Sequence, residues 1–158
     1  MLVGGLLSVG GAVAPQIVRY RLKAGRSRKA LAGAFAGEIA ATCAIARRRD
    51  YLSALRQLRT RVRESGRAER LTVRVSLDYF QVYRANAGSL GLLPAAIARD
   101  IALFYTQTKS FLEDVVPEAR NPRGAAEAEH VLNADIDLLE ESLALGERLV
   151  TQLAEIRA

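Results

Sequence analysis

Apolar residues recur at steps of three and four along most of the chain, which is the period of amphipathic helices. The pattern predicts two long helices, over residues 30–63 and 125–157, and two shorter ones between them, over 76–90 and 94–116. The last helix carries a heptad seam formed by Leu132, Ile136, Leu139, Leu143, Gly146, Val150 and Leu153. Two long helices of nearly equal length with two shorter ones between them predict an all-α antiparallel bundle.

Composition agrees with a helical protein and excludes several other classes. Ala (27) and Leu (22) are the most frequent residues, half of the chain is apolar, and only four residues are Pro. This excludes a disordered chain, and a single Cys excludes a disulfide scaffold or a Cys-rich zinc module. The chain has 20 Arg and 3 Lys, a usage that we interpret as that of a GC-rich bacterial genome.

Residues 2–18 form an uncharged apolar stretch that predicts a membrane anchor. As a helix these residues span about 25 Å, the lower limit for crossing the hydrocarbon core. Cations follow at once, and we expect them to contact lipid headgroups: Arg19, Arg21, Lys23, Arg26, Arg28 and Lys29. This one-sided positive charge predicts a single-pass protein of a bacterial inner membrane, with its N-terminus outside and its bulk in the cytoplasm.

Other interpretations of the N-terminal part remain open. A cleaved signal peptide fits Ala12-Val13-Ala14, although Pro15 would then be the first mature residue. A soluble or interfacial helix is weakened by four glycines within residues 2–18 and by the lack of a polar face. Residues 30–46 are also apolar, but Glu38 and the basic residues on both sides oppose their insertion as a second span.

Charge divides the chain into a basic and an acidic part. Residues 19–74 carry 16 Lys and Arg against 4 Asp and Glu, whereas residues 75–158 carry 7 against 13. We expect helix 30–63 to pack antiparallel against helix 125–157, so that part of the imbalance is internal. Contact with anionic lipid or with nucleic acid remains an alternative for the arginines of the first helix, which are Arg47, Arg48, Arg49, Arg56, Arg59, Arg61 and Arg63.

The sequence holds no motif for catalysis, phosphate binding or metal binding. The P-loop, the dinucleotide-binding glycine pattern, H-E-x-x-H and C-x-x-C are all absent. Cys43 lies on an apolar helix without a His nearby in sequence, and His130 lies among carboxylates near the start of the last helix. We therefore expect no enzyme activity, no cofactor, no metal site and no small-molecule substrate.

One polar-aromatic cluster is predicted, formed by Tyr79, Tyr83, Asn86 and Tyr105. Tyr83 and Asn86 lie three residues apart and so share one helix face, and Tyr105 is expected to meet them from the next helix. We expect a buried Asn–Tyr hydrogen-bond network that fixes the register of the helices. A ligand pocket is the alternative.

Two segments carry a resemblance: GEIAATCAIARRRDYLSALR (37–56) and DYFQVYRANAGSLGLLPAAIARDIALFYTQTKSFLEDV (78–115). Together with the basic-flanked apolar N-terminus, they resemble a set of small uncharacterised bacterial single-pass membrane-anchored helical proteins. The shared features are an acidic-apolar Glu-Ile helix, an Arg-rich turn, and a Tyr-x-x-Asn segment that continues through Leu-Gly-Leu-Leu to Phe-Tyr-Thr. The resemblance covers residues 2 to about 115. It implies a membrane anchor, but no activity and no site residues.

These observations predict two parts of the chain with different surroundings. Residues 1–29 are the anchor with its basic juxtamembrane segment, and residues 30–158 are the cytoplasmic helical bundle. The function that we predict is that of a membrane-anchored scaffold or regulatory protein, which binds an unidentified protein partner or itself and has no catalytic activity. The alternative is a soluble basic helical protein that binds nucleic acid or anionic surfaces.

Overall fold

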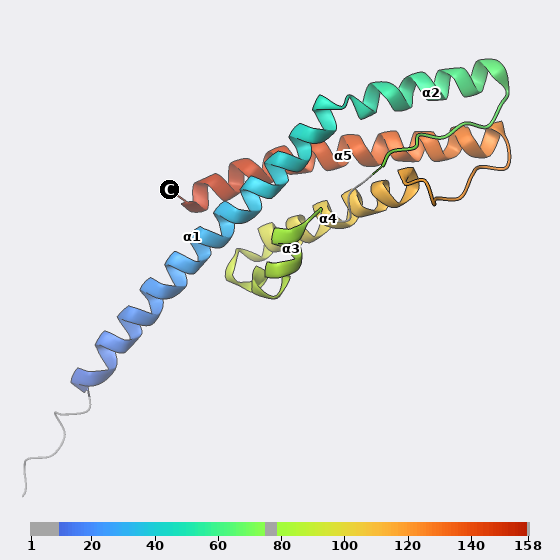
Figure 1. The fold of residues 1–158 in the computed structure, drawn as a ribbon. Coiled ribbons are helices and arrows are strands. Elements are labelled where there is room, and N and C mark those ends of the chain that lie inside the picture. The colour runs from blue at the N-terminus through green and yellow to red at the C-terminus, as the bar shows by residue number, and fades with distance from the viewer. Residues whose placement is uncertain (1–9, 75–78, 158) are drawn as a thin grey trace, which may run out of the picture.

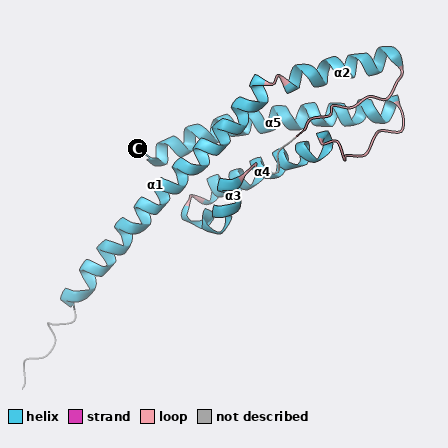
Figure 2. Cartoon of the chain, in the orientation of Figure 1, coloured by secondary structure: helices cyan, strands magenta, loops and turns pink. Residues whose placement is uncertain are grey.

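The computed structural model describes residues 10–74 and 79–157, with side chains from residue 23 onward. Every regular element in these ranges is a helix, which confirms the all-α prediction (Figures 1 and 2). The elements are α1 (Gly10–Arg48), α2 (Tyr51–Ser65), α3 (Gln81–Asn86), the 3₁₀ helix η1 (Ala87–Leu92), α4 (Ala95–Val115) and α5 (Ala125–Arg157). The last two begin and end within a residue or so of their predicted bounds.

Helix α1 is a long rod, of which only the C-terminal part belongs to the bundle. Its N-terminal part runs away from the other helices, and its C-terminal part crosses α5 (Figure 1). Residues 23–30 are largely exposed, and the buried side chains of α1 begin at Leu31. The expected boundary between the anchor part (residues 1–29) and the bundle (residues 30–158) lies inside one continuous helix. At this point the side chains change from exposed to buried. Of the expected span, residues 2–9 and all the side chains lie outside the described residues.

The single helix predicted over residues 30–63 is wrong at Arg49 and Asp50, where α1 ends and α2 begins. Asp50 adopts a left-handed conformation (φ 50°, ψ 43°), which Asp tolerates better than most residues. The Asp50 N–H donates to the Arg47 carbonyl at 2.9 Å, so the last turn of α1 is tightened. The break changes the direction of the chain, and α2 then follows α5 along its length (Figure 1).

Helices α1 and α2 run antiparallel to α5, as predicted from their opposite charges. Three ion pairs join α1 and α2 to α5: Arg47–Glu147, Arg56–Glu140 and Arg63–Glu129. The arginine numbers increase from pair to pair while the glutamate numbers decrease, as antiparallel helices require. The side chains of all three pairs are about half exposed, so each pair contributes only about 0–1 kcal/mol. The ion pairs thus line up along the antiparallel helices, and apolar burial along α5 is the larger contribution to stability.

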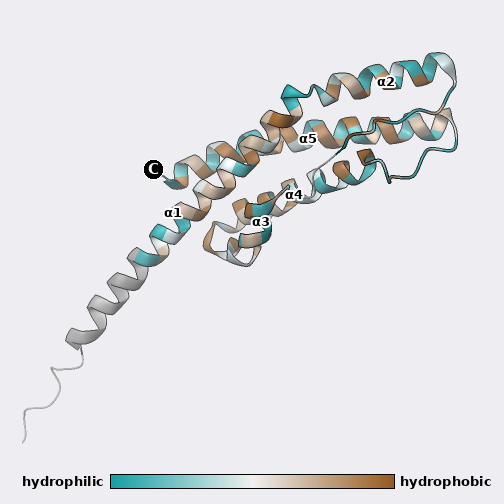
Figure 3. Ribbon diagram, in the orientation of Figure 1, coloured by the Kyte–Doolittle hydropathy of each residue, from teal (hydrophilic) through white to brown (hydrophobic). Residues whose placement is uncertain are grey.

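Helix α4 covers the other side of α5, and α3 with η1 packs against α1. Ile101, Phe104, Phe111 and Val115 of α4 are buried in the core. Brown and teal alternate along α2, α4 and α5 in Figure 3, as expected for amphipathic helices, and α2 buries Leu55, Leu58 and Val62. The short helix predicted over 76–90 is shorter than expected: α3 starts at Gln81 and changes at Ala87 into a 3₁₀ turn, and part of the remainder lies outside the described residues.

Candidate functional site

Four aromatic rings gather where α1, α3 and α4 meet. The rings of Tyr83 and Tyr105 are stacked, with centroids 4.2 Å apart and an interplanar angle of 18°. Phe80 meets Tyr105 edge-on at 5.2 Å, and Phe35 of α1 lies 6.4 Å from both tyrosine rings. The structure therefore brings together Tyr83 and Tyr105, as the sequence predicts. Such ring pairs contribute about 0.5–1.5 kcal/mol beyond their burial.

The carboxylate of Glu38, a residue of α1, accepts hydrogen bonds from α3 and α4 and so links the aromatic cluster to α1. The backbone N–H groups of Val82 and Tyr83 donate to Glu38 Oε1 and Oε2 at 2.8 and 3.0 Å. The Tyr105 hydroxyl donates to Glu38 Oε2 at 2.6 Å. Because Phe80 at the start of α3 offers no side-chain cap, Glu38 satisfies the N-terminal N–H groups of α3 from another helix.

Sequence reasoning assigned the polar role in this cluster to Asn86 and missed Glu38. The Asn86 side-chain amide donates instead to the Val82 carbonyl, one turn back in its own helix, at 2.8 Å. The expected Asn–Tyr network is replaced by a Tyr–Glu bond and two backbone bonds to the same carboxylate. The signal that was available is a single carboxylate in the apolar run 30–46, which must find partners if it faces the core.

Two side chains near this site are held in their neutral forms. Burial, followed by the hydrogen bond to the Glu38 carboxylate, raises the pKa of Tyr105 far above its usual range, so its hydroxyl remains a donor. Burial also raises the pKa of the Cys43 thiol, which lies in the same core. A buried thiol that resists ionisation is a poor nucleophile, and Cys43 therefore acts here as a packing residue.

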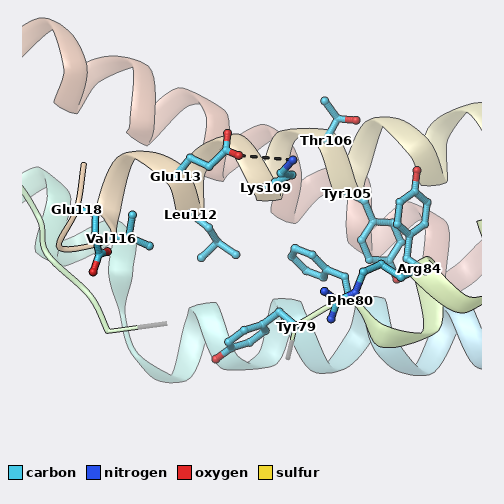
Figure 4. A pocket seen from close by; sticks show the side chains of 11 residues that line it. Tyr79, Phe80, Arg84, Tyr105, Thr106, Lys109, Leu112, Glu113, Val116 and Glu118 are labelled. Atoms are coloured by element: carbon cyan, nitrogen blue, oxygen red, sulfur yellow. Dashed lines mark ion pairs between the residues drawn. The ribbon is translucent and has the colours of Figure 1, made fainter. Parts of the chain in front are cut away.

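A groove of about 640 Å³ opens beside the aromatic group, between Tyr79 and Phe80 on one side and α4 on the other (Figure 4). Its floor is apolar and aromatic, and charged side chains stand at its edges. Lys109 pairs with Glu113 across one turn of α4 at 3.5 Å. The full lining is Tyr79, Phe80, Tyr83, Arg84, Tyr105, Thr106, Lys109, Leu112, Glu113, Val116 and Glu118. An apolar group fits this groove better than a charged one.

The predicted headgroup contacts all lie on the part of α1 that leaves the bundle. Four of these residues have exposed side chains: Lys23, Arg26, Arg28 and Lys29. The other two, Arg19 and Arg21, lie in α1, and their side chains are outside the described part of the structure. By length and composition the stretch Lys23–Arg48 is able to span a membrane. About a third of its apolar window is buried in the bundle, where Phe35 and Ile39 are fully enclosed.

Within the described part of the chain, no group of three or more His, Cys, Asp or Glu is arranged to hold a metal ion. No protein-family model, no curated protein and no solved structure matches the chain. The geometry of the site is that of a structural junction with an apolar groove beside it.

Proposed function

We propose that the protein is a membrane-anchored helical interaction protein, a scaffold or regulator without catalytic activity. Residues 2–18 anchor it in a bacterial inner membrane, with the N-terminus outside and the bundle in the cytoplasm. The observation that carries this proposal is the rod α1, which continues without interruption from Gly10 into the bundle and carries exposed cations where it leaves. Along its basic segment, residues 23–29, no other helix of the described residues packs against α1 (Figure 1), so this segment is well suited to pass through a headgroup layer.

The basic segment supports this arrangement through its position next to the uncharged stretch. Each Lys or Arg near an anionic membrane surface contributes about 1 kcal/mol of attraction. Six such residues follow residues 2–18, and the described four have exposed side chains. Long cationic side chains also place their charges in the headgroups while their stems remain in apolar surroundings.

The junction at Glu38 supports a role in which anchor and bundle move together. Its three hydrogen bonds connect α1 to α3 and α4, and the apolar face of the same helix packs against α5. Hydrogen bonds to a charged acceptor contribute about 1.5–3 kcal/mol each, more than neutral ones. We infer that α1 holds the bundle in a fixed orientation relative to the membrane.

The alternative is a soluble basic protein that binds nucleic acid or another anionic surface. The arginines of α2 provide less support for it than their number suggests, because several are engaged by the chain itself. Arg56 and Arg63 pair with carboxylates of α5, and Arg59 donates to Asn133 at 2.9 Å. Neutralised arginines contribute little to phosphate binding.

Membrane extraction of the full-length protein tests the proposal. We expect the protein to remain in the membrane pellet after both high salt and alkaline carbonate, and the double variant Leu6→Arg/Leu7→Arg to lose this resistance. As a matched control, the variant with Lys23, Arg26, Arg28 and Lys29 changed to Gln should remain resistant to carbonate, because its apolar stretch is intact. Release of the unaltered protein by salt alone, together with binding to nucleic acid at the same salt concentration, would favour the alternative.

A further inference from the structure

A second long uncharged run lies at the turn between α3 and α4. Between Arg84 and Arg99 there are 14 consecutive residues without a charged side chain, in a chain where one residue in four is charged. Only the N-terminal stretch that ends at Val18 is longer. The sequence of the run is ANAGSLGLLPAAIA. It contains one Asn and otherwise only Ala, Gly, Leu, Ile, Ser and Pro.

This run is exposed, which distinguishes it from an apolar core segment. Leu92, at the end of η1, is 45% exposed. The neighbouring residues that face solvent are Ala85, Ala87, Gly88, Gly91, Pro94, Ala95 and Ala96. Gly, Pro, Asn and Ser are ordinary turn residues. What distinguishes this turn is that its fourteen residues, with the exposed Leu92 among them, carry no charge.

The turn is held firmly against α1 at the end of the bundle where that helix leaves it. Leu93 is 5% exposed and belongs to the same buried cluster as Leu31, Ala32 and Phe35. Figure 1 shows η1 beside α1, next to the part of the rod that extends away from the bundle. In Figure 3 the turn is largely brown to white, and teal segments of α1 lie nearby. An apolar turn and a basic helix segment therefore lie at the same end of the molecule.

We propose that the turn formed by residues 85–98 is a second membrane contact, which rests against the lipid headgroup layer of the leaflet that α1 crosses. This inference rests on the proposed function, because it requires residues 2–18 to be the anchor. Arg84 and Arg99 flank the turn, and Arg99 is paired with Asp100 at 2.8 Å. Leu92 is the side chain that reaches furthest into the interface.

The geometry of α1 requires the rod to lean toward the turn. The helix rises about 1.5 Å per residue, so the thirteen residues from Val18 to Leu31 would hold the bundle about 20 Å from the hydrocarbon if α1 stood upright. The headgroup layer on each side is only about 5–7 Å thick. Membrane helices lean by about 20° on average and up to about 40°. A lean of about 40° reduces this height to about 15 Å. Because the turn packs on one side of α1, about 8–10 Å from its axis, the same lean lowers Leu92 by about 6 Å more, to the outer edge of the headgroup layer.

Single tryptophan reporters test this contact, because the chain contains no Trp of its own. The variants Leu92→Trp, Leu103→Trp and Leu7→Trp are each reconstituted as full-length protein in vesicles of mixed phosphatidylcholine and phosphatidylglycerol. Emission is then measured with lipids spin-labelled on the headgroup or on the acyl chain. Leu103 of α4 is the matched control, since it is an exposed leucine (46%) that lies two turns further along α4. Ala95→Trp repeats the measurement at a second position of the turn.

We expect headgroup-labelled lipid to quench Leu92→Trp and Ala95→Trp strongly and to leave Leu103→Trp close to its unquenched intensity. Leu7→Trp should be quenched by the acyl-chain label, which reports the anchor separately. If Leu7→Trp is quenched while the two turn reporters behave like Leu103→Trp, the second contact is wrong and the anchor stands. If Leu103→Trp is quenched as strongly as Leu92→Trp, the side of α4 faces the bilayer and the proposal is also overturned. If Leu7→Trp is not quenched, the proposed function fails and this inference fails with it.

Discussion

Gly146 of α5 lies directly against Cys43 of α1, at the point where the two long helices cross. A β-carbon added to Gly146 would lie 2.5 Å from Cys43 Sγ and 2.9 Å from a ring carbon of Phe104. A β-carbon does not come this close to a sulfur or carbon atom of another side chain unless that neighbour is displaced. The glycine in the heptad seam therefore sets how closely α1, α4 and α5 approach one another.

Gly146→Ala should destabilise the protein by about 1–3 kcal/mol, because overpacking outweighs the gain in helix propensity. Gly37→Ala is the matched control: Gly37 also lies within a helix, but an added β-carbon there would meet nothing within 4 Å. That variant should be neutral or more stable by up to about 1 kcal/mol. Urea unfolding followed by circular dichroism measures both. Equal effects of the two substitutions would contradict the close crossing at Gly146.

Glu38→Gln should destabilise the protein by about 2–4 kcal/mol, because one of the two acceptor oxygens becomes a donor facing backbone N–H groups or the Tyr105 hydroxyl. Tyr105→Phe removes only one of the three bonds and should have a smaller effect. Hydrogen exchange of the Val82 and Tyr83 amides reports the junction directly, and both should exchange faster in Glu38→Gln. Unchanged exchange of these amides would show that Glu38 does not cap α3.

Leu139→Ala should reduce the free energy of unfolding by about 2–5 kcal/mol, since Leu139 is 4% exposed and belongs to the core cluster between α2, α4 and α5. Glu147→Gln removes the ion pair with Arg47 and should have an effect of about 0–1 kcal/mol, because both side chains are about half exposed or more. Denaturant unfolding compares the two. A larger effect of Glu147→Gln would mean that charge, and not the seam, supplies the stability.

Stability should fall as the pH rises from about 4 to about 7, because of the buried carboxyl of Asp135 on α5. This side chain is 4% exposed, and burial together with the neighbouring Asp114 raises the pKa of its carboxyl to about 7. Since the ordinary pKa is about 4, the folded state favours the protonated form. Its contribution to stability is complete below about pH 4 and is lost as the pH rises through about 7.

Asp135→Asn should remove much of this pH dependence and stabilise the protein at pH 8, by up to about 4 kcal/mol for a shift of this size. Asp137→Asn, an exposed position two residues further along α5, should leave the pH profile unchanged. Thermal unfolding measured from about pH 4 to about pH 8, which spans the ordinary and the raised pKa of Asp135, distinguishes the two variants. A profile that is the same in Asp135→Asn and the unaltered protein would show that Asp135 is not held protonated in the folded state.

The helices themselves follow from local sequence. Pro94 and Pro117 bracket α4, and the two-proline loop before Gly124 precedes α5, because Pro fixes where a helix begins or cannot continue. The antiparallel pairing of the basic and acidic helices also follows from sequence, because their complementary charges and matching lengths favour one direction.

The tertiary structure alone decided which polar groups meet in the core. The sequence identified Tyr83 and Tyr105 as members of one cluster, but their polar partner, Glu38, lies more than forty residues before Tyr83 and is brought there by the crossing of α1. The break at Asp50 was missed, although the apolar stripe makes a step of six residues there, from Ala46 to Leu52, across four charged residues. The direction that α2 takes after the break is set by its packing against α5. Periodicity reports which face of a helix is buried, whereas the contacts that bend a helix or satisfy a buried carboxylate depend on residues distant in the chain.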